Sequence, residues 1–318
     1  MHATHTRLPI ALLALAALAV SSATPELAWA ACPQSLCDCL DEAGGYRVVA
    51  SEHVTAGVGM VRDFDYRFRI GTIILNGDVC ATTAFLAEPA NDYTEIDGNL
   101  YALAGPGTVA IKAKVFGPAS GDSVGALTNA TGGGSIFGPI AGAVDTTGTH
   151  PGIASCQEAI SDVQAASQLL AFLAPTQALG DIRIYDGSVV QINAGPGVNV
   201  FSAGRIALKA RTIGFSIESS IVKIVLDPAT EAVVINAASL FVGKNCGIRV
   251  VGDERKVLIN LPFAGPTSLI QEDAVVDAGV LAPYRVVRVG SRTELNAAYG
   301  RRVLLKGPFM AQSTQICG

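Results

Sequence analysis

The segment Ile221-Val222-Lys223-Ile224-Val225-Leu226 is the clearest β-strand in this sequence. Most of its residues are β-branched and nearly all are apolar, which is typical of a strand buried on both faces. From Asp181 onward, short runs of this kind follow one another, and turn residues separate most of them. We therefore expect this half of the chain to be mainly β. Besides Ile221–Leu226, the predicted strands are Val189–Asn193, Val198–Ser202, Ile213–Glu218, Ala232–Asn236, Ser239–Val242, Ile248–Val251, Lys256–Leu261, Thr267–Gln271, Val286–Val289 and Val303–Leu305.

Residues 155–174, just before this β block, are predicted to form an α-helix. Ser155 and Glu158 have the spacing of a capping box, in which both side chains bond backbone N–H groups at a helix start. Apolar residues then recur at three- and four-residue steps as far as Pro175, which ends the pattern. A helix with one apolar face must pack on a flat apolar surface.

A stack of β-coils would give this helix a flank to pack on, whereas the alternative, a β-sandwich, leaves a lone long helix unexplained. Two similar turns favour coils: Leu75-Asn76-Gly77-Asp78-Val79 and, about 20 residues later, Ile96-Asp97-Gly98-Asn99-Leu100. Glycine between short apolar strands supplies the positive φ that such a corner needs. We predict a mainly β chain: a right-handed parallel β-helix (β-solenoid) with one long α-helix packed along its flank.

The composition is close to that of a membrane protein, with 50% hydrophobic and 15% charged residues and a mean hydropathy of +0.41. The longest apolar run, Leu8–Val20, contains Pro9 and is shorter than the roughly 20 residues that cross a bilayer as a helix. Arg7 precedes this run, and an Ala28-Trp29-Ala30 cleavage pattern follows it. Residues 1–30 are therefore predicted to be a signal peptide, and the mature chain is expected to have no transmembrane segment.

After the signal peptide we expect a Cys-rich N-terminal leader, residues 31–45, and a single β-solenoid domain, residues 46–318. Within that domain, residues 117–153 are rich in Gly and are predicted to be a loop or cap. Cysteines of an exported chain are candidates for disulfides because the compartment is oxidising. Their count is odd, and Cys32 stands where a lipoprotein carries its acylated cysteine. A disulfide-tied leader is the favoured interpretation, and a lipid anchor at Cys32 is the alternative. The seven cysteines are Cys32, Cys37, Cys39, Cys80, Cys156, Cys246 and Cys317.

Three motifs follow the predicted helix in a fixed order: Gly195-Pro196-Gly197-Val198-Asn199-Val200-Phe201, Val257-Leu258-Ile259-Asn260-Leu261-Pro262 and Gly279-Val280-Leu281-Ala282-Pro283. In these motifs the chain resembles the choice-of-anchor A family of bacterial surface proteins, over about residues 155–307. The resemblance implies an extracellular β-solenoid flanked by a helix, similar in architecture to ice-binding-like adhesive domains. It also implies an adhesive or surface-structural role, since some relatives are described as collagen-binding adhesins.

The polar residues of these motifs are expected to be structural. Asn199 and Asn260 lie within apolar strands, where an amide side chain can form ladders or bond the backbone of an adjacent coil. Pro283 is expected to fix φ at a strand end. We therefore assign no binding role to these three residues.

Catalytic groups are scarce, so we expect no enzyme, no catalytic residue, no cofactor and no metal. After the signal peptide the sequence has two histidines, His53 and His150, and neither a Gly-x-Ser-x-Gly nor a His-Glu-x-x-His motif. The alternative is a polysaccharide lyase or hydrolase, which needs paired carboxylates or an acidic cluster with a basic residue. Asp63 and Asp65 beside Arg62, Arg67 and Arg69 are the one dense candidate, and Asp181, Asp186 and Asp253 are scattered.

A net charge of −5 disfavours nucleic acid as a partner, because phosphates call for clustered Lys and Arg. Ice binding is a second alternative, which only Ala81-Thr82-Thr83-Ala84 and Thr146-Thr147 favour. The function we predict is non-enzymatic: an adhesive or structural protein that binds an extracellular matrix protein or a surface glycan. Its predicted location is secreted, extracellular or at the outer cell surface.

Overall fold

The computed structural model describes part of the chain, and the fold is given for that part. The predicted signal peptide, Cys32 and almost all of the predicted loop or cap at 117–153 lie outside the described residues. The described residues are 36–56, 73–76, 78–86, 93–97, 100–103, 109–111, 114–116, 127–128, 144–145, 152–290, 292–305 and 309–311.

The described chain is mainly β. Before the long helix it forms β1 (Tyr46–Ala56), β2 (Ile73–Asn76), β3 (Asp78–Leu86), β4 (Tyr93–Asp97), β5 (Leu100–Ala102), β6 (Val109–Ile111), β7 (Lys114–Phe116), β8 (Leu127–Thr128) and β9 (Val144–Asp145). After the helix it forms β10 (Gln177–Ile184), β11 (Val189–Ala194), β12 (Gly197–Leu208), β13 (Arg211–Ile213), β14 (Ser216–Glu218), β15 (Ile221–Leu226), β16 (Thr230–Val242), β17 (Gly247–Val251), β18 (Val257–Asn260), β19 (Ser268–Ile270), β20 (Val275–Val289), β21 (Glu294–Leu305) and β22 (Phe309–Ala311).

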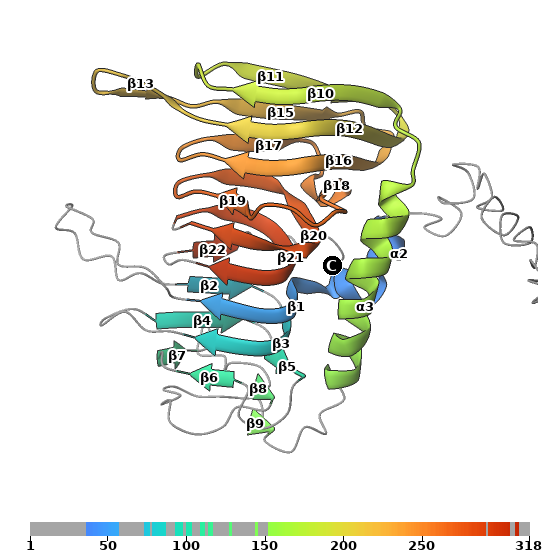
Figure 1. Cartoon of the computed structure of the whole chain (residues 1–318), viewed down its shortest axis with the longest axis vertical. Helices are drawn as coiled ribbons and strands as arrows, with labels where there is room; N and C mark the ends of the chain where they lie inside the picture. The colour runs from blue at the N-terminus through green and yellow to red at the C-terminus, as the bar shows by residue number, and fades with distance from the viewer. Residues whose placement is uncertain are drawn as a thin grey trace, which may run out of the picture.

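Parallel pairing stacks these strands into coils, as Figure 1 shows. Val222 on β15 lies in register with Ile248 on β17, which lies in register with Val276 on β20, and Val276 with Leu295 on β21. All four side chains point into the stack and are buried. Such in-register columns of apolar residues form one continuous core, which is the expected interior of a β-helix.

The segment Ile221–Leu226 is a strand with the predicted bounds, but it is buried on one face only. Val222 and Ile224 are buried, whereas Ile221, Lys223 and Val225 are half-buried on the outer side. The prediction of burial on both faces was therefore wrong. The outer side of this strand is one of the two sides of the stack that no helix covers (Figure 1).

The coils do not stack in the order of the sequence. β1 pairs with β21 on one side and with β3 on the other, so the first strand of the stack lies between the last coil and the second. In Figure 1 the blue β1 accordingly lies in the middle of the molecule. The chain continues from β1 to one end of the stack, and the long helix leads it back to the opposite end at β10.

That long helix, α3 (Gly152–Ala171), covers one side of the stack. Its buried residues, among them Val163 and Leu170, pack on outward residues of the coils such as Val234 and Leu258. The prediction of a helix on the flank of the coils is therefore confirmed. The helix begins before Ser155, so Ser155 is not its N-cap, and its hydroxyl donates to the Glu42 carboxylate at 2.6 Å instead.

Two short helical turns precede β1: α2 (Leu36–Leu40) and the 3-10 turn η1 (Asp41–Gly45). Both pack against α3, and Leu36, Leu40 and Ala43 share its apolar cluster. Part of the predicted Cys-rich leader is thus folded onto the helix side of the stack.

Disulfides were expected, and the structure contains them. Cys80 on β3 is bonded to Cys156 on α3, a bridge between residues 76 apart in sequence. Cys37 and Cys39 are disulfide-bonded as well. Cys246 is a buried free thiol, and burial raises its pKa.

The strands that flank the repeated turns of the N-terminal part lie in register in adjacent coils, as the repeat predicts. Leu75 on β2 lies in register with Ile96 on β4, and Val79 on β3 with Leu100 on β5.

The predicted strand Ile213–Glu218 is instead the greater part of a β-hairpin, β13–β14, which is the one antiparallel pair in the described part of the chain. Gly214 has φ +59, which allows the chain to reverse at Gly214-Phe215. A six-residue apolar pattern cannot show this reversal, because a hairpin arm and a strand have the same period.

Candidate functional site

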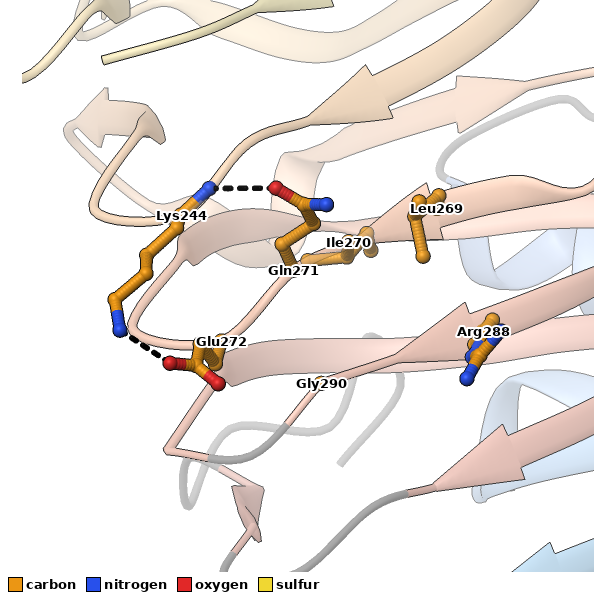
Figure 2. A pocket seen from close by; sticks show the side chains of 7 residues that line it. All are labelled: Lys244, Leu269, Ile270, Gln271, Glu272, Arg288 and Gly290. Atoms are coloured by element: carbon orange, nitrogen blue, oxygen red, sulfur yellow. Dashed lines mark hydrogen bonds and ion pairs between the residues drawn. The ribbon is translucent and has the colours of Figure 1, made fainter. Parts of the chain in front are cut away.

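A pocket of about 340 Å³, drawn in Figure 2, lies beside β19 on a side of the stack that α3 leaves uncovered. Lys244 lies in the turn after β16, Gln271 and Glu272 in the turn after β19, and Gly290 in the turn after β20. Three successive turns thus form its rim. The full lining consists of Lys244, Leu269, Ile270, Gln271, Glu272, Arg288 and Gly290.

Gly290 is required where these turns meet. A side-chain Cβ at this position would lie 2.4 Å from the Glu272 backbone nitrogen and 2.6 Å from the Gln271 carbonyl carbon. Its own N–H donates to the Ile270 carbonyl oxygen at 2.7 Å. Only glycine lets the turns after β19 and β20 approach this closely.

An apolar strip leads from the adjacent coil into the pocket. Phe241 on β16 lies in register with Leu269 on β19, which lies in register with Arg288 on β20. Phe241 and Leu269 are half-buried, and Arg288 is exposed. Within the described part of the chain, no carboxylate pairs with the Arg288 guanidinium.

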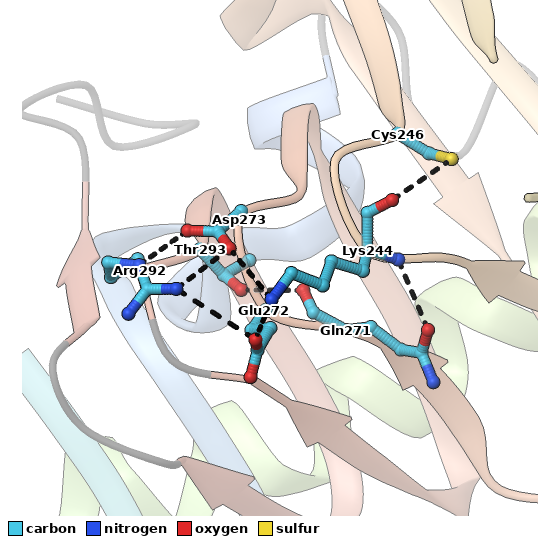
Figure 3. A network of polar contacts seen from close by, with 7 residues as sticks. All are labelled: Lys244, Cys246, Gln271, Glu272, Asp273, Arg292 and Thr293. Carbon is cyan, nitrogen blue, oxygen red and sulfur yellow. Dashed lines mark hydrogen bonds and ion pairs between the residues drawn. The ribbon is translucent and has the colours of Figure 1, made fainter. Parts of the chain in front are cut away.

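The rim of the pocket belongs to a network of charged side chains (Figure 3). Lys244 Nζ bonds the Glu272 carboxylate and lies 3.7 Å from Asp273 Oδ2. Arg292 donates to Asp273 Oδ2 at 2.8 Å and lies 3.8 Å from Glu272 Oε1. The hydrogen bond from Arg292 holds the pKa of Asp273 below its usual value, and the bond to Glu272 raises the pKa of Lys244.

Uncharged contacts hold the same turns together. The Lys244 backbone N–H donates to Gln271 Oε1 at 3.1 Å, and Thr293 Oγ1 donates to the Gln271 carbonyl oxygen at 2.9 Å. Asp273 and Arg292 both adopt positive φ, 56° and 53°, which bends the chain sharply at the corner. The rim is therefore fixed by several contacts, as a preformed binding site requires.

In this network the positive charges of Lys244 and Arg292 are balanced by the carboxylates of Glu272 and Asp273. Arg288 is the remaining charged residue of the pocket lining, and its guanidinium is available to a ligand. No group of three or more potential metal ligands occurs in the described residues. The free Arg288 guanidinium allows the pocket to bind a polar ligand with a negative group.

Of the acidic residues considered for catalysis, those that the structure describes do not converge. Asp63, Asp65, Arg62, Arg67 and Arg69 lie outside the described residues, as does His150. Each of the other three candidates bonds a near neighbour in sequence: Asp181 pairs with Arg183 at 2.6 Å, Asp186 accepts from Ser188 Oγ at 2.6 Å, and Asp253 accepts from Arg255 Nε at 2.9 Å.

His53 and Thr82, which the structure describes, form no site either. His53 lies on β1, where burial and the nearby Arg302 lower its pKa. Thr82 Oγ1 donates to the Ser51 carbonyl oxygen at 2.7 Å, so its hydroxyl is used within the coils. Thr146 and Thr147 lie outside the described residues.

The two asparagines have the structural roles expected of them. Asn260 Nδ2 donates to the Ser167 carbonyl oxygen on α3 at 2.9 Å and to Asn236 Oδ1 on the next coil at 2.8 Å, while Ser167 Oγ donates to Asn260 Oδ1 at 2.6 Å. Asn236 Nδ2 in turn donates to the Leu170 carbonyl oxygen at 2.8 Å. Asn199 accepts from the Gly195 N–H at 3.0 Å and so closes the turn before β12.

Sequence reasoning did not find the pocket. Its residues come from three separate turns and from the strands β19 and β20, and they have no shared motif. They meet only because β16, β19 and β20 stack. Gly290 could have been a signal, since it directly follows a predicted strand.

None of the helices in the described ranges has the length and apolar content that a bilayer crossing requires. The fold and site together define a mainly β, β-helix-like protein with a flanking helix and a polar surface pocket.

No family model matches the chain, and no curated protein matches it in sequence. Solved structures do match it. One is an ice-binding protein from the Antarctic ascomycete Antarctomyces psychrotrophicus, at 13% identity and a TM-score of 0.45, covering 84% of this chain and 94% of that one. Another is an ice-binding protein from an Antarctic biological consortium, at 13% identity and a TM-score of 0.49, covering 86% of this chain and 89% of that one. An ice-binding domain from Shewanella frigidimarina matches at 12% identity and a TM-score of 0.26, covering 84% of this chain and 96% of that one.

Proposed function

We propose that this chain is a secreted, non-enzymatic binding protein of the cell surface, wound as a right-handed β-solenoid, that holds an acidic glycan in the pocket of Figure 2. The observation that carries the proposal is the Arg288 guanidinium, which has no carboxylate partner in the described chain and stands at the end of the apolar strip of Phe241 and Leu269. Membership of the choice-of-anchor A family is part of the same proposal.

The pocket has the size and polarity that a sugar requires. Its volume of about 340 Å³ lies at the lower end of the range of small-molecule sites, roughly 300–1,000 Å³. A guanidinium can bind a uronate carboxylate or a sulfate through two parallel N–H donors. Leu269 offers an apolar surface for the C–H face of the ring, and Gln271 can exchange hydrogen bonds with hydroxyl groups.

The test is titration of the purified chain with acidic oligosaccharides, uronate-containing and sulfated, beside neutral oligosaccharides of equal length. We expect saturable binding of one acidic class, weakened about 10- to 100-fold by Arg288→Ala, because a hydrogen bond to a charged group contributes about 1.5–3 kcal/mol. Arg205→Ala is the matched control, since Arg205 is an exposed arginine of β12 outside the pocket. Equal loss in both variants, or no binding by the parent chain, would contradict the proposal.

Ice is a second candidate ligand, for which the other uncovered side of the stack is the relevant surface. Val189, Ile221, Gly247 and Val275 occupy one outward column with one uncharged residue per coil, and Glu294 on β21 continues the column with a charge. Parallel coils repeat such a column about every 4.8 Å, which suits a periodic solid. In the next column Lys223 and Arg249 interrupt the apolar surface, so we place ice second.

Thermal hysteresis separates the two candidates. If ice is the ligand, the parent chain depresses the freezing point below the melting point, and Ile221→Arg abolishes the effect while Arg288→Ala leaves it unchanged. A thermal hysteresis equal to that of buffer would exclude ice as a ligand and would leave the glycan proposal unaffected.

The polysaccharide-cleaving alternative is tested with the same oligosaccharides. We expect no shortened product after prolonged incubation with the parent chain. Appearance of unsaturated or reducing ends would make the protein an enzyme and direct attention to Asp63 and Asp65.

A further inference from the structure

The coil formed by β10 and β11 ends the stack, at the top of Figure 1. Within the described part of the chain, β11 pairs with β15 alone and β10 with β12 alone. The outer edge of each strand therefore carries backbone N–H and C=O groups with no strand beside them. An edge of this kind is a template for another strand.

The hydrogen bonds of β11 show which of its backbone groups are free. The Ser188 carbonyl accepts from the Ile221 N–H at 3.1 Å, and the Ala194 carbonyl accepts from the Asp227 N–H at 3.0 Å. Successive residues of a strand point their backbone groups to opposite sides. Val189, Gln191 and Asn193 therefore direct theirs to the open edge.

β11 lacks the features by which proteins protect an edge strand. Its sequence, VVQINA, contains no charge and no proline, and its register with β15 runs without a bulge. Val190 points toward the core but is 39% exposed, whereas its register partner Val222 is 2% exposed. The core is thus uncovered at this end, above Val190.

Exposed apolar side chains gather around the same coil. Seven of the nine large hydrophobic residues exposed in the described chain lie on this coil, on the hairpin β13–β14 or on the link from α3 to β10. The base of the hairpin lies beside the β10–β11 turn, since a Cβ on Gly187 would meet Glu218 Cβ at 2.4 Å. A gathering of this kind marks an interaction surface. The seven are Phe172, Tyr185, Val189, Val190, Ile213, Phe215 and Ile217.

We propose that this end binds a second copy of the chain, through antiparallel pairing of β11 with β11 about a two-fold axis at Gln191. In that register the outward Val189 faces Asn193 of the other copy, and the inward Val190 faces Ile192. The three odd-numbered positions then form about six main-chain hydrogen bonds. Val190 becomes covered, and no charges oppose each other.

A closed dimer of two copies fits the open edge of β11 better than an open head-to-tail stack of many copies. At the other end of the described stack the strands paired on one side only are β6, β7 and β9, of two or three residues each, and none of them matches the six-residue edge of β11. A two-fold contact uses the same edge twice and closes. This proposal does not depend on the ligand of the pocket.

Sedimentation equilibrium of the purified chain tests the proposal, with variants that place a positive or a negative charge at position 191. We expect the parent to be a dimer, and Gln191→Lys and Gln191→Glu each to raise the dimer Kd at least tenfold, because two like charges meet at the axis. An equimolar mixture of the two variants is expected to recover the dimer. Gln157→Lys, the same change on an exposed residue of α3, is the control and is expected to remain dimeric.

A backbone variant tests the pairing itself. Gln191→Pro removes an N–H that points to the open edge, so the circular dichroism spectrum is expected to match that of the parent while the dimer is lost. A monomeric parent at concentrations near 1 mM would overturn the proposal. A dimer that persists in Gln191→Lys and Gln191→Glu alike, or a mixture that stays monomeric, would overturn it too.

Discussion

Asn260 connects three parts of the molecule with one side chain. Its amide contacts Ser167 on α3 and Asn236 on the adjacent coil, and the residue is completely buried. In the sequence it is a polar residue in an apolar strand, which was enough to predict a structural role. Its partners could not be predicted, because Ser167 lies 93 residues away and is reached only when α3 packs on the coils.

Asn260→Ala is expected to destabilise the protein by about 2–4 kcal/mol, because it leaves the Ser167 hydroxyl and an Asn236 oxygen buried without this partner. The free energy of unfolding from urea titration measures the effect. Gln157→Ala on the exposed face of α3 is the control and should change it by less than about 0.5 kcal/mol. A loss for Asn260→Ala as small as that of the control would contradict the structural role.

Asp277 on β20 predicts a particular dependence of stability on pH. Burial raises its pKa above that of the unfolded chain, and the Val250 N–H and Arg249 oppose the shift only in part. Its contribution to stability is therefore present below the unfolded pKa and is lost as the pH rises through the folded value. Asp277→Asn should melt at a higher temperature than the parent at pH 7 and at a similar temperature near pH 3. The opposite order at pH 7 would show that Arg249 outweighs burial.

Among the elements, α3 depends on the Cys80–Cys156 bridge for its attachment near its N-terminal end. Because the bridge closes a loop of 76 residues, replacing both cysteines by serine is expected to cost about 2–5 kcal/mol. Thermal unfolding of the double variant measures this. Cys246→Ser is a control of a different kind, since it removes a buried thiol without breaking a bridge.

The strands show how far local pattern predicts an element. Ile221–Leu226 has the predicted bounds, whereas Ala232–Asn236 and Ser239–Val242 are parts of one long strand, β16. Ala237 and Ala238 have low β-propensity and separate the two predicted runs, but parallel pairing with β12 continues the strand through them. Pairing between coils thus determines the length of a strand. That length cannot be predicted from the sequence of the strand alone.

At the scale of the whole molecule, the mainly β architecture and the helix on its flank followed from the sequence, but the order of the coils did not. The pairing of β1 with β21 joins Val48 to Ala298, and no local pattern specifies so distant a contact. The pocket depends on the same stacking of coils, which is why its residues were not identified.

The coil order predicts an unusual pattern of hydrogen exchange. Amides of β1 and β21 should be among the slowest to exchange, because both strands lie inside the stack and are paired on both sides. Amides of β11 that point to the open edge should be fast in the monomeric Gln191→Lys variant. Hydrogen–deuterium exchange read by mass spectrometry resolves these segments. Rapid exchange in β1 would contradict the interior position.

The position of β1 also determines how early the stack can be completed during synthesis of the chain. A ribosome makes β1 early, yet the strand that covers one of its edges, β21, is made about 250 residues later, which takes tens of seconds at roughly 5–20 residues per second. During that interval one edge of the first coil has no partner, so coils cannot simply be added in the order in which they are synthesised. The nascent chain must wait for its last strands before the stack can close.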